Sequence, residues 1–210
     1  MAKISGCVFD FGGVMTSTSM PERVRPLAEG LGVPWSALEE GFARYRRLMD
    51  GGFITLDEMY DNIWADAGVS PEKSVRARIL EEDQASYLYR NEDTLRLMRA
   101  LKAAGFKIGI LTNMPSPFAA KFRRGFPDFI ALADAMVVSG EEKMFKPQRR
   151  IYDLLRDRIS LPADGLCFFD DSPANCDGAR AAGWSAILFR GAAQAAREFS
   201  ELSGTAVPGF

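Results

Sequence analysis

Histidine is absent from all 210 residues of the chain. Its absence excludes the Ser-His-Asp and Cys-His arrangements of nucleophilic catalysis, and it also excludes zinc sites that are ligated by histidine. Any chemistry in this protein must therefore use carboxylates, lysines, hydroxyls or thiols. Carboxylate oxygens are the ligands that hard cations such as Mg²⁺ prefer.

Cysteine is scarce: the chain has Cys7, Cys167 and Cys176. Two of them lie in apolar, strand-like runs, and no pair has the spacing of a metal-binding motif. We therefore expect reduced thiols, as is usual for cytoplasmic proteins.

Long apolar runs and a strong charge imbalance are also missing. No run approaches the length of a membrane span, and the N-terminus has no apolar secretion segment, so we expect a cytoplasmic protein that does not bind membranes. The net charge of −2 argues against nucleic acid as a partner, because such proteins usually carry a basic surplus. Small acidic metabolites need only a local positive site. The sequence does not indicate an oligomeric state.

Short apolar runs separated by helical patterns make up most of the chain. Five of these runs read as buried strands: 4–9, 106–111, 135–138, 166–169 and 186–189. Strands that alternate with helices predict an α/β fold, a Rossmann-like doubly wound parallel sheet with helices on both faces. We assign residues 1–15 and 90–210 to this core domain.

Residues 16–89 break the alternation, because helical patterns there follow one another without a convincing strand. Capping residues indicate three helix starts in this segment: Ser36 with Glu39, Thr55 with Glu58, and Ser70-Pro71. The segment is predicted to be a small all-helical domain inserted after the first strand.

Polar residues follow three of the predicted strands. Asp10 precedes Gly12 and Gly13 at the end of the first strand, and Thr112 with Asn113 follows the second. Open α/β sheets bind ligands at the carboxyl ends of their strands, and glycines let the backbone approach a ligand closely. Read singly, each segment is also compatible with an ordinary turn or a helix cap.

Asp170 and Asp171 follow the strand at 166–169. Two adjacent carboxylates beside a buried strand are unfavourable unless a cation or hydrogen-bond donors satisfy them. Capping of the helix that starts at Ser172-Pro173 can account for one carboxylate but hardly for both. Lys146, held before Pro147, is the candidate cation between the second strand and this pair, although a single lysine is most often a solvated surface residue.

The ordered set Asp10, Thr112-Asn113, Lys146, Asp170-Asp171 resembles the haloacid dehalogenase superfamily over nearly the whole chain. The helical insertion resembles the helical (C1) cap of that superfamily. Three segments look closest to phosphatases of the glucose-1-phosphate phosphatase type: Asp-Phe-Gly-Gly-Val at 10–14, Lys146-Pro147 leading into 150–152, and Asp170 to Asn175. The phosphatase half of soluble epoxide hydrolases is a near relative of this type.

The resemblance implies a role for each residue. Asp10 is the expected nucleophile that forms an aspartyl phosphate, and Lys146 the expected catalytic cation. Phosphate contacts are expected from Thr112, Asn113 and Gly13. The expected Mg²⁺ ligands are Asp10, the Gly12 carbonyl, Asp171 and Asp170. Asn175 is expected to lie behind these ligands. The implied reaction is Mg²⁺-dependent hydrolysis of a small phosphorylated metabolite, a sugar phosphate such as glucose 1-phosphate being favoured.

Gly12 departs from the superfamily pattern, which usually has a second aspartate two positions after the nucleophile as general acid and base. General acid–base catalysis is typically worth roughly 10²–10⁴-fold in rate. We therefore expect either a substrate with a good leaving group or a replacement acid from the cap.

Three alternatives remain open at this stage. A 2-haloacid dehalogenase would share the nucleophile but would not need the metal that Asp170 and Asp171 indicate. A phosphate-binding or interaction protein without turnover would explain the missing acid, and a phosphomutase would need that acid more acutely. The dense run at 44–49, with three arginines, is interpreted as a solvated helix face and left out of the site.

Overall fold

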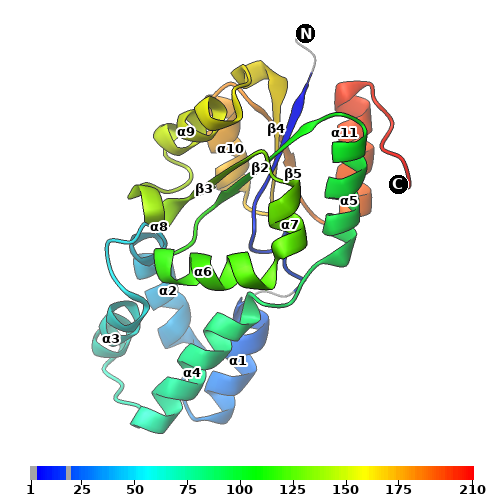
Figure 1. Ribbon diagram of the computed structural model, residues 1–210. Helices are drawn as coiled ribbons and strands as arrows, with labels where there is room; N and C mark the ends of the chain where they lie inside the picture. Colours follow the sequence, from blue (N-terminus) through cyan, green and yellow to red (C-terminus); the bar gives the residue numbers. More distant parts are fainter. Residues whose placement is uncertain (1–3, 18–19) are drawn as a thin grey trace.

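The computed structural model describes residues 4–17 and 20–210. Its centre is one sheet of five parallel strands in the order β3-β2-β1-β4-β5 (Figure 1). The strands are β1 (Gly6–Phe9), β2 (Lys107–Thr112), β3 (Ala135–Val138), β4 (Leu166–Asp170) and β5 (Ser185–Leu188). All five predicted strands are confirmed, as is the α/β fold.

Helices cover both faces of the sheet, so side chains on both faces of a strand are buried. Val8 belongs to one apolar cluster, while its neighbours Cys7 and Phe9 belong to the cluster on the opposite face. This alternation explains why the strands read as continuous apolar runs rather than as alternating ones. The three cysteines are buried and form no disulfide.

The helices of the core follow β1 in chain order. They are α5 (Glu92–Ala103), α6 (Ser116–Gly125), α7 (Pro127–Leu132), α8 (Ser139–Glu142), α9 (Arg149–Ile159), α10 (Pro173–Ala181) and α11 (Ala192–Ser203), with a 3₁₀ turn, η1 (Ala163–Gly165). Helices α5, α6, α7 and α11 pack on the face that contains Cys7, and α9 and α10 on the face that contains Val8. Among the described residues, no helix combines the length and apolarity needed to cross a bilayer.

Four further helices lie at the carboxyl edge of the sheet, with α6 between them and the strands (Figure 1). They are α1 (Met20–Gly30), α2 (Trp35–Asp50), α3 (Leu56–Ala67) and α4 (Lys73–Ser86). Their buried side chains, including Leu38, Ile63 and Trp64, form an apolar cluster separate from the two clusters of the sheet. The four helices therefore have a core of their own, although they interrupt the chain between β1 and β2.

Two sets of hydrogen bonds, among other contacts, join these four helices to the rest of the chain. In the first, the entering and leaving segments run antiparallel: Ser17 N donates to Tyr89 O at 2.8 Å, and Asn91 N donates to Met15 O at 2.8 Å. In the second, Ser139 Oγ donates to the carbonyl of Asp50 at the end of α2. The four helices are thus held over the carboxyl edge from two sides.

The strand order reverses beside β1. The chain builds β1, β2 and β3 to one side and then crosses to β4 on the other side of β1. Ligands of open α/β sheets bind at such a switch point, outside the carboxyl ends of the strands. A ligand site is therefore expected at the residues that follow β1, β2 and β4.

Two predicted helix starts are wrong, and one is confirmed. Helix α2 begins at Trp35 after Pro34, so Ser36 lies inside the helix; the burial of Trp35 beside Phe42 takes the helix back past the serine. Helix α4 begins at Lys73 after Glu72, two residues beyond Ser70-Pro71. The capping box of Thr55 and Glu58 is present as predicted.

Gly41 provides a test of the contact between α2 and α3. A Cβ atom added at Gly41 would lie 2.8 Å from Ile63 Cγ2 and 2.9 Å from Ile63 Cβ. We expect Gly41→Ala to lower the free energy of unfolding by about 1–3 kcal/mol through overpacking, although alanine is the better helix former. Urea denaturation measures the effect.

Gly30→Ala is the matched control, because no atom lies within 4 Å of an added Cβ at the end of α1. We expect this variant to be neutral or more stable by about 0.4–1 kcal/mol. Equal effects of the two substitutions would contradict the proposed tight contact at Gly41.

Candidate active site

Asp10 lies directly after the central strand β1. Its backbone N–H donates to Phe169 O at 2.9 Å, so the pairing with β4 fixes where the side chain leaves the sheet. The side chain is almost buried, since the residue is 7% exposed. One carboxylate oxygen, Oδ1, lies 2.7 Å from Lys146 Nζ.

Lys146 connects two carboxylates. Its Nζ lies 2.7 Å from Asp10 Oδ1 and 2.6 Å from Asp170 Oδ2, and the residue is 1% exposed. Burial alone would lower the pKa of this lysine, but the charges of Asp10 and Asp170 outweigh it and raise the pKa above its usual value. Lys146 is therefore a protonated cation beside the predicted nucleophile.

Asn113 holds the backbone of this lysine. Lys146 N donates to Asn113 Oδ1 at 2.8 Å, and Asn113 Nδ2 donates to Lys146 O at 3.1 Å. Asn113 was predicted as a phosphate ligand; the structure also gives its amide a positioning contact. Thr112, the last residue of β2, is buried and does not line the cavity described below.

Asp170 ends β4, and hydrogen-bond donors surround its carboxylate. Oδ1 accepts from Ser172 N at 2.8 Å and from Asn175 Nδ2 at 3.0 Å; Oδ2 accepts from Asn175 Nδ2 at 3.1 Å and from Lys146 Nζ at 2.6 Å. Both oxygens are thus engaged by protein donors, and Asn175 contacts Asp170 from the start of α10.

Asp171 is exposed and approaches the loop that follows β1. Gly13 has φ +72°, and a Cβ added there would lie 2.8 Å from Asp171 Cγ and still closer to Oδ2. A side chain at Gly13 would therefore collide with Asp171 and strain the backbone. The Gly13 N–H donates to Thr16 Oγ1 at 2.9 Å, which closes the turn.

Three carboxylates gather at this edge. One oxygen from each of Asp10, Asp170 and Asp171 lies within 4.8 Å of the others. Burial raises the pKa of Asp10 to about 8, with Lys146 opposing and the two neighbouring aspartates adding to the shift. Burial, followed by the charge of Asp170, raises the pKa of Asp171 to about 6. The cluster therefore holds more negative charge than Lys146 balances.

A divalent cation fits this donor set. The available ligand atoms are hard carboxylate oxygens, which Mg²⁺ prefers. The carboxylates also carry more negative charge than Lys146 neutralises. Four donor contacts occupy Asp170, so Asp10 and Asp171 have more carboxylate capacity left for a cation.

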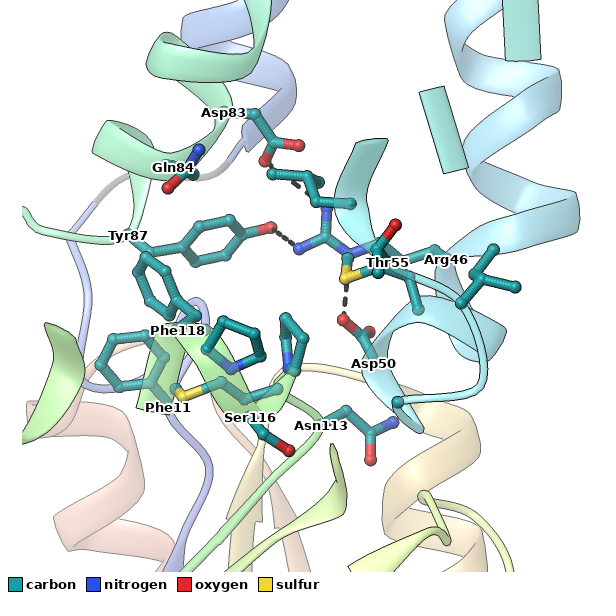
Figure 2. Close-up of a pocket in the computed structure, with 18 of the residues that line it drawn as sticks. Phe11, Arg46, Asp50, Thr55, Asp83, Gln84, Tyr87, Asn113, Ser116 and Phe118 are labelled. Atoms are coloured by element: carbon teal, nitrogen blue, oxygen red, sulfur yellow. Dashed lines mark hydrogen bonds and ion pairs between the residues drawn. The ribbon is translucent and has the colours of Figure 1, made fainter. Parts of the chain in front are cut away.

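A cavity of about 680 Å³ opens between this cluster and helices α2 and α4. The loop from Asp10 to Gly13, together with Asp171 and Asn113, forms its floor. Figure 2 shows Asn113 and Ser116 on the side of the sheet, and Arg46, Asp50 and Asp83 on the side of the helical bundle. The candidate site therefore lies at the junction of the two parts of the chain.

Arg46 is the site residue that the sequence interpretation placed wrongly. Arg44 and Arg47 are exposed, as expected of a solvated helix face. Arg46, in contrast, lines the cavity, and its guanidinium lies 3.3 Å from Asp50 Oδ1, 3.5 Å from Asp83 Oδ1 and 2.8 Å from Tyr87 Oη (Figure 2). The spacing of Arg46 and Asp50, four residues apart on a helix, was the available signal.

A family model described as haloacid dehalogenase-like hydrolase matches residues 4–183. The chain therefore belongs to the haloacid dehalogenase-like hydrolases, as the motif order predicted.

Among curated proteins, the chain is similar to bifunctional epoxide hydrolase 2 of Mus musculus, with 26% identity over 95% of this chain. It spans 39% of that longer protein. It is also similar to (S)-2-haloacid dehalogenase 1 of Pseudomonas sp. strain CBS-3, at 26% identity over 89% of this chain and 85% of the relative. Phosphatase MT3486 of Mycobacterium tuberculosis is 25% identical over 88% of this chain and 87% of the relative.

Solved structures share the fold. A HAD-like family hydrolase from Porphyromonas gingivalis superimposes with a TM-score of 0.73 at 17% identity, covering 96% of this chain and 98% of that one. A HAD family enzyme from Bacteroides thetaiotaomicron, solved in complex with magnesium and inorganic phosphate, has a TM-score of 0.65 at 20% identity, covering 90% and 95%.

The raised pKa of Asp10 predicts that the carboxylate cluster lowers stability when no cation is bound. The folded protein holds the Asp10 proton up to its pKa of about 8, whereas the unfolded chain releases it near the ordinary aspartate pKa of 3.8. The contribution of Asp10 to the free energy of unfolding therefore falls as the pH rises between these values. We expect Asp10→Asn in EDTA at pH 7.5 to be more stable than the native chain, by about 1–3 kcal/mol.

Urea denaturation at several pH values measures this difference, which should grow from pH 5 to pH 8. Asp164→Asn, which changes an exposed carboxylate in η1, is the control and should show no such growth. A constant difference, or a less stable Asp10→Asn, would contradict the electrostatic interpretation.

Proposed function

We propose that this hydrolase is an Mg²⁺-dependent phosphatase in which Asp10 attacks the phosphorus of a phosphomonoester. The observation that carries the proposal is the set of three carboxylates around a buried lysine, all within reach of one cation. Residues 16–89 are proposed to form the cap over this site, since the cavity lies between their helices and the strand ends.

In the proposed reaction, an Asp10 oxygen forms a bond to phosphorus while the bond from phosphorus to the alcohol oxygen breaks. Water then hydrolyses the aspartyl phosphate, which regenerates the carboxylate and releases phosphate. The Lys146 ammonium, 2.7 Å from Asp10, stabilises the negative charge at the reacting oxygen. Phosphate contacts are proposed for Asn113 and the backbone of Gly13, which line the cavity. The contact expected of Thr112 stays a prediction, because this residue is buried outside the lining.

The proposed Mg²⁺ ligands are Asp10, the Gly12 carbonyl and Asp171, with Asp170 and Asn175 behind them. When bound, Mg²⁺ supplies positive charge that stabilises the transferring phosphoryl group. Asp170 orients Lys146 and the turn that follows β4, because its oxygens accept from Lys146, Ser172 and Asn175.

A dehalogenase function is the second candidate, because a 2-haloacid dehalogenase is among the similar proteins. Attack on carbon with loss of halide needs no metal, however, and leaves the exposed carboxylate of Asp171 beside Asp10 unexplained. The phosphatase proposal accounts for both carboxylates. A phosphate-binding protein without turnover would share the site and differ only in its rate.

Activity on an aryl phosphate tests the function directly. We expect 4-nitrophenyl phosphate hydrolysis that needs Mg²⁺, stops in EDTA and falls by at least about 10³-fold in Asp10→Asn, since loss of a covalent nucleophile costs orders of magnitude. Asp171→Asn should require more Mg²⁺ for half-maximal rate, whereas Asp164→Asn should behave like the native chain. Undiminished turnover in Asp10→Asn would refute the mechanism, and metal-independent chloride release from 2-chloropropionate would favour the dehalogenase.

Gly12 allows the missing acid to be tested. A Cβ added there meets only Tyr87 Cε1, at 3.7 Å, within 4 Å, so the Cβ of Gly12→Asp makes no steric clash. We expect this variant to change kcat/KM more for an alkyl phosphate than for 4-nitrophenyl phosphate, because the poor leaving group needs a proton. Equal changes on the two substrates would contradict a gap in general acid catalysis.

The sequence resemblance favours a sugar phosphate such as glucose 1-phosphate as the substrate. A replacement acid from the cap also stays a prediction, and Asp50 is the candidate. Burial raises the pKa of its carboxyl group to about 6, which is near enough to neutrality for the group to exchange a proton. The side chains around the cavity bear on which alcohol the site accepts.

A further inference from the structure

Apolar side chains form a wall that makes up much of the cavity lining. Its side chains come from the end of α2, the connection to α3, the segment after β2 and the start of α6. They are Met49, Phe53, Ile54, Leu56, Met114, Pro115, Pro117 and Phe118, with Phe11 beside them. Burying a hydrocarbon against such a surface is favourable by roughly 25 cal/mol per Å² of apolar area.

Several of the polar side chains around this wall already have partners in the protein. Arg46 contacts Asp50, Asp83 and Tyr87. Thr55 and Glu58 cap each other at the start of α3. These groups keep only part of their hydrogen-bonding capacity for a ligand.

Arg46 offers no net positive charge to a ligand, because it lies between two carboxylates, Asp50 and Asp83. Lys121 donates to Gln84, and Lys143 donates to the carbonyl of Gly52. These acceptors are neutral, so both lysines keep their positive charge, but both side chains are exposed, and solvent screens the charge there.

Phe53 shows that part of the apolar wall is open. The residue is 55% exposed, and its ring meets Phe145 edge-on with centroids 6.4 Å apart. It belongs to the connection between α2 and α3 and lines the cavity. An apolar ligand group in the cavity would cover this exposed ring.

We propose that the substrate is a phosphomonoester whose alcohol is largely hydrocarbon, an aromatic ring or an alkyl chain, rather than a sugar. This proposal rests on the phosphatase function proposed above. The ring hydroxyls of a sugar would exchange water for phenylalanine, methionine and proline, and unpaired buried hydroxyls are costly. A hydrocarbon of the same size gains free energy on the same surface. A cavity of about 680 Å³ is in the size range of small-molecule sites.

Phenyl phosphates with different 4-substituents separate the effect of the wall from that of the leaving group. The 4-methyl, 4-pentyl and 4-hydroxymethyl compounds have similar phenol leaving groups but differ in apolar area. One buried methylene is worth about 0.8 kcal/mol, or up to about four-fold in binding. We expect kcat/KM for the 4-pentyl compound to exceed that for the 4-methyl compound by about 10-fold or more, and the 4-hydroxymethyl compound and glucose 1-phosphate to be the poorest.

Phe53→Gln tests the wall itself. We expect it to lower the ratio of kcat/KM for 4-pentyl over 4-methyl compounds by about five-fold, because the substitution removes apolar contact area. Leu202→Gln is the matched control: Leu202 is an exposed apolar residue (48%) on α11, outside the cavity, and its substitution should leave the ratio unchanged.

Failure of this proposal can be told apart from failure of the phosphatase function. A flat response to chain length, or higher kcat/KM on glucose 1-phosphate, overturns the apolar substrate while the phosphatase stands. If no phosphate ester is hydrolysed, the phosphatase function fails. Isothermal titration of Asp10→Asn with the 4-pentyl and 4-methyl compounds then tests whether the cavity wall binds hydrocarbon. Tighter binding of the 4-pentyl compound then supports an apolar site, and equal binding overturns it.

Discussion

The contact of the Lys146 ammonium with Asp10 and Asp170 is the constraint on which the rest of the site depends. Removing a lysine and two carboxylates from water costs several kcal/mol per ion, and the cost is recovered only with good geometry and further hydrogen bonds. The chain supplies these bonds: Asn113 holds the lysine backbone, and Ser172 and Asn175 donate to Asp170. Because β1 and β4 are neighbours, the parallel pairing itself brings the two carboxylates to one cation.

The three carboxylates carry more negative charge than the Lys146 ammonium neutralises. The proposed function of the site depends on this excess negative charge. Asp171 adds a third carboxylate that Lys146 does not contact, and Gly13 has no side chain to keep it away. A protein selected for stability alone would replace one of these carboxylates by an amide. Burial, together with the charges of the neighbouring aspartates, raises the pKa of Asp10 and of Asp171, and a bound divalent cation would favour the ionised carboxylates instead.

The sequence predicts the features that depend on neighbouring residues in the chain, and it does not predict those that depend on how distant elements pack together. Asp10, Asp170 and Asp171 were found because they directly follow buried strands, and the order of the motifs identified the family. Arg46 could not be found in this way: its spacing of four residues from Asp50 indicates an ion pair on the helix, but whether that pair faces water or a cavity depends on how α2 lies against α4. The displaced start of α2 has the same origin, since the burial of Trp35 outweighs a serine cap.

The glycine at position 12 and the apolar cavity wall together restrict the substrate in two independent ways. Without an acid at Gly12, departure of an alkoxide is slow, so a leaving group that is stable as an anion is favoured. The wall of Met114, Phe118 and Phe53 favours a hydrocarbon at the same end of the ester. A phenol-like alcohol satisfies both conditions, whereas a sugar phosphate linked through its anomeric oxygen satisfies only the first. In the proposed phosphatase, Phe53 from residues 16–89 shares the contact with the alcohol with Met114 and Phe118, while the strand ends supply the chemistry.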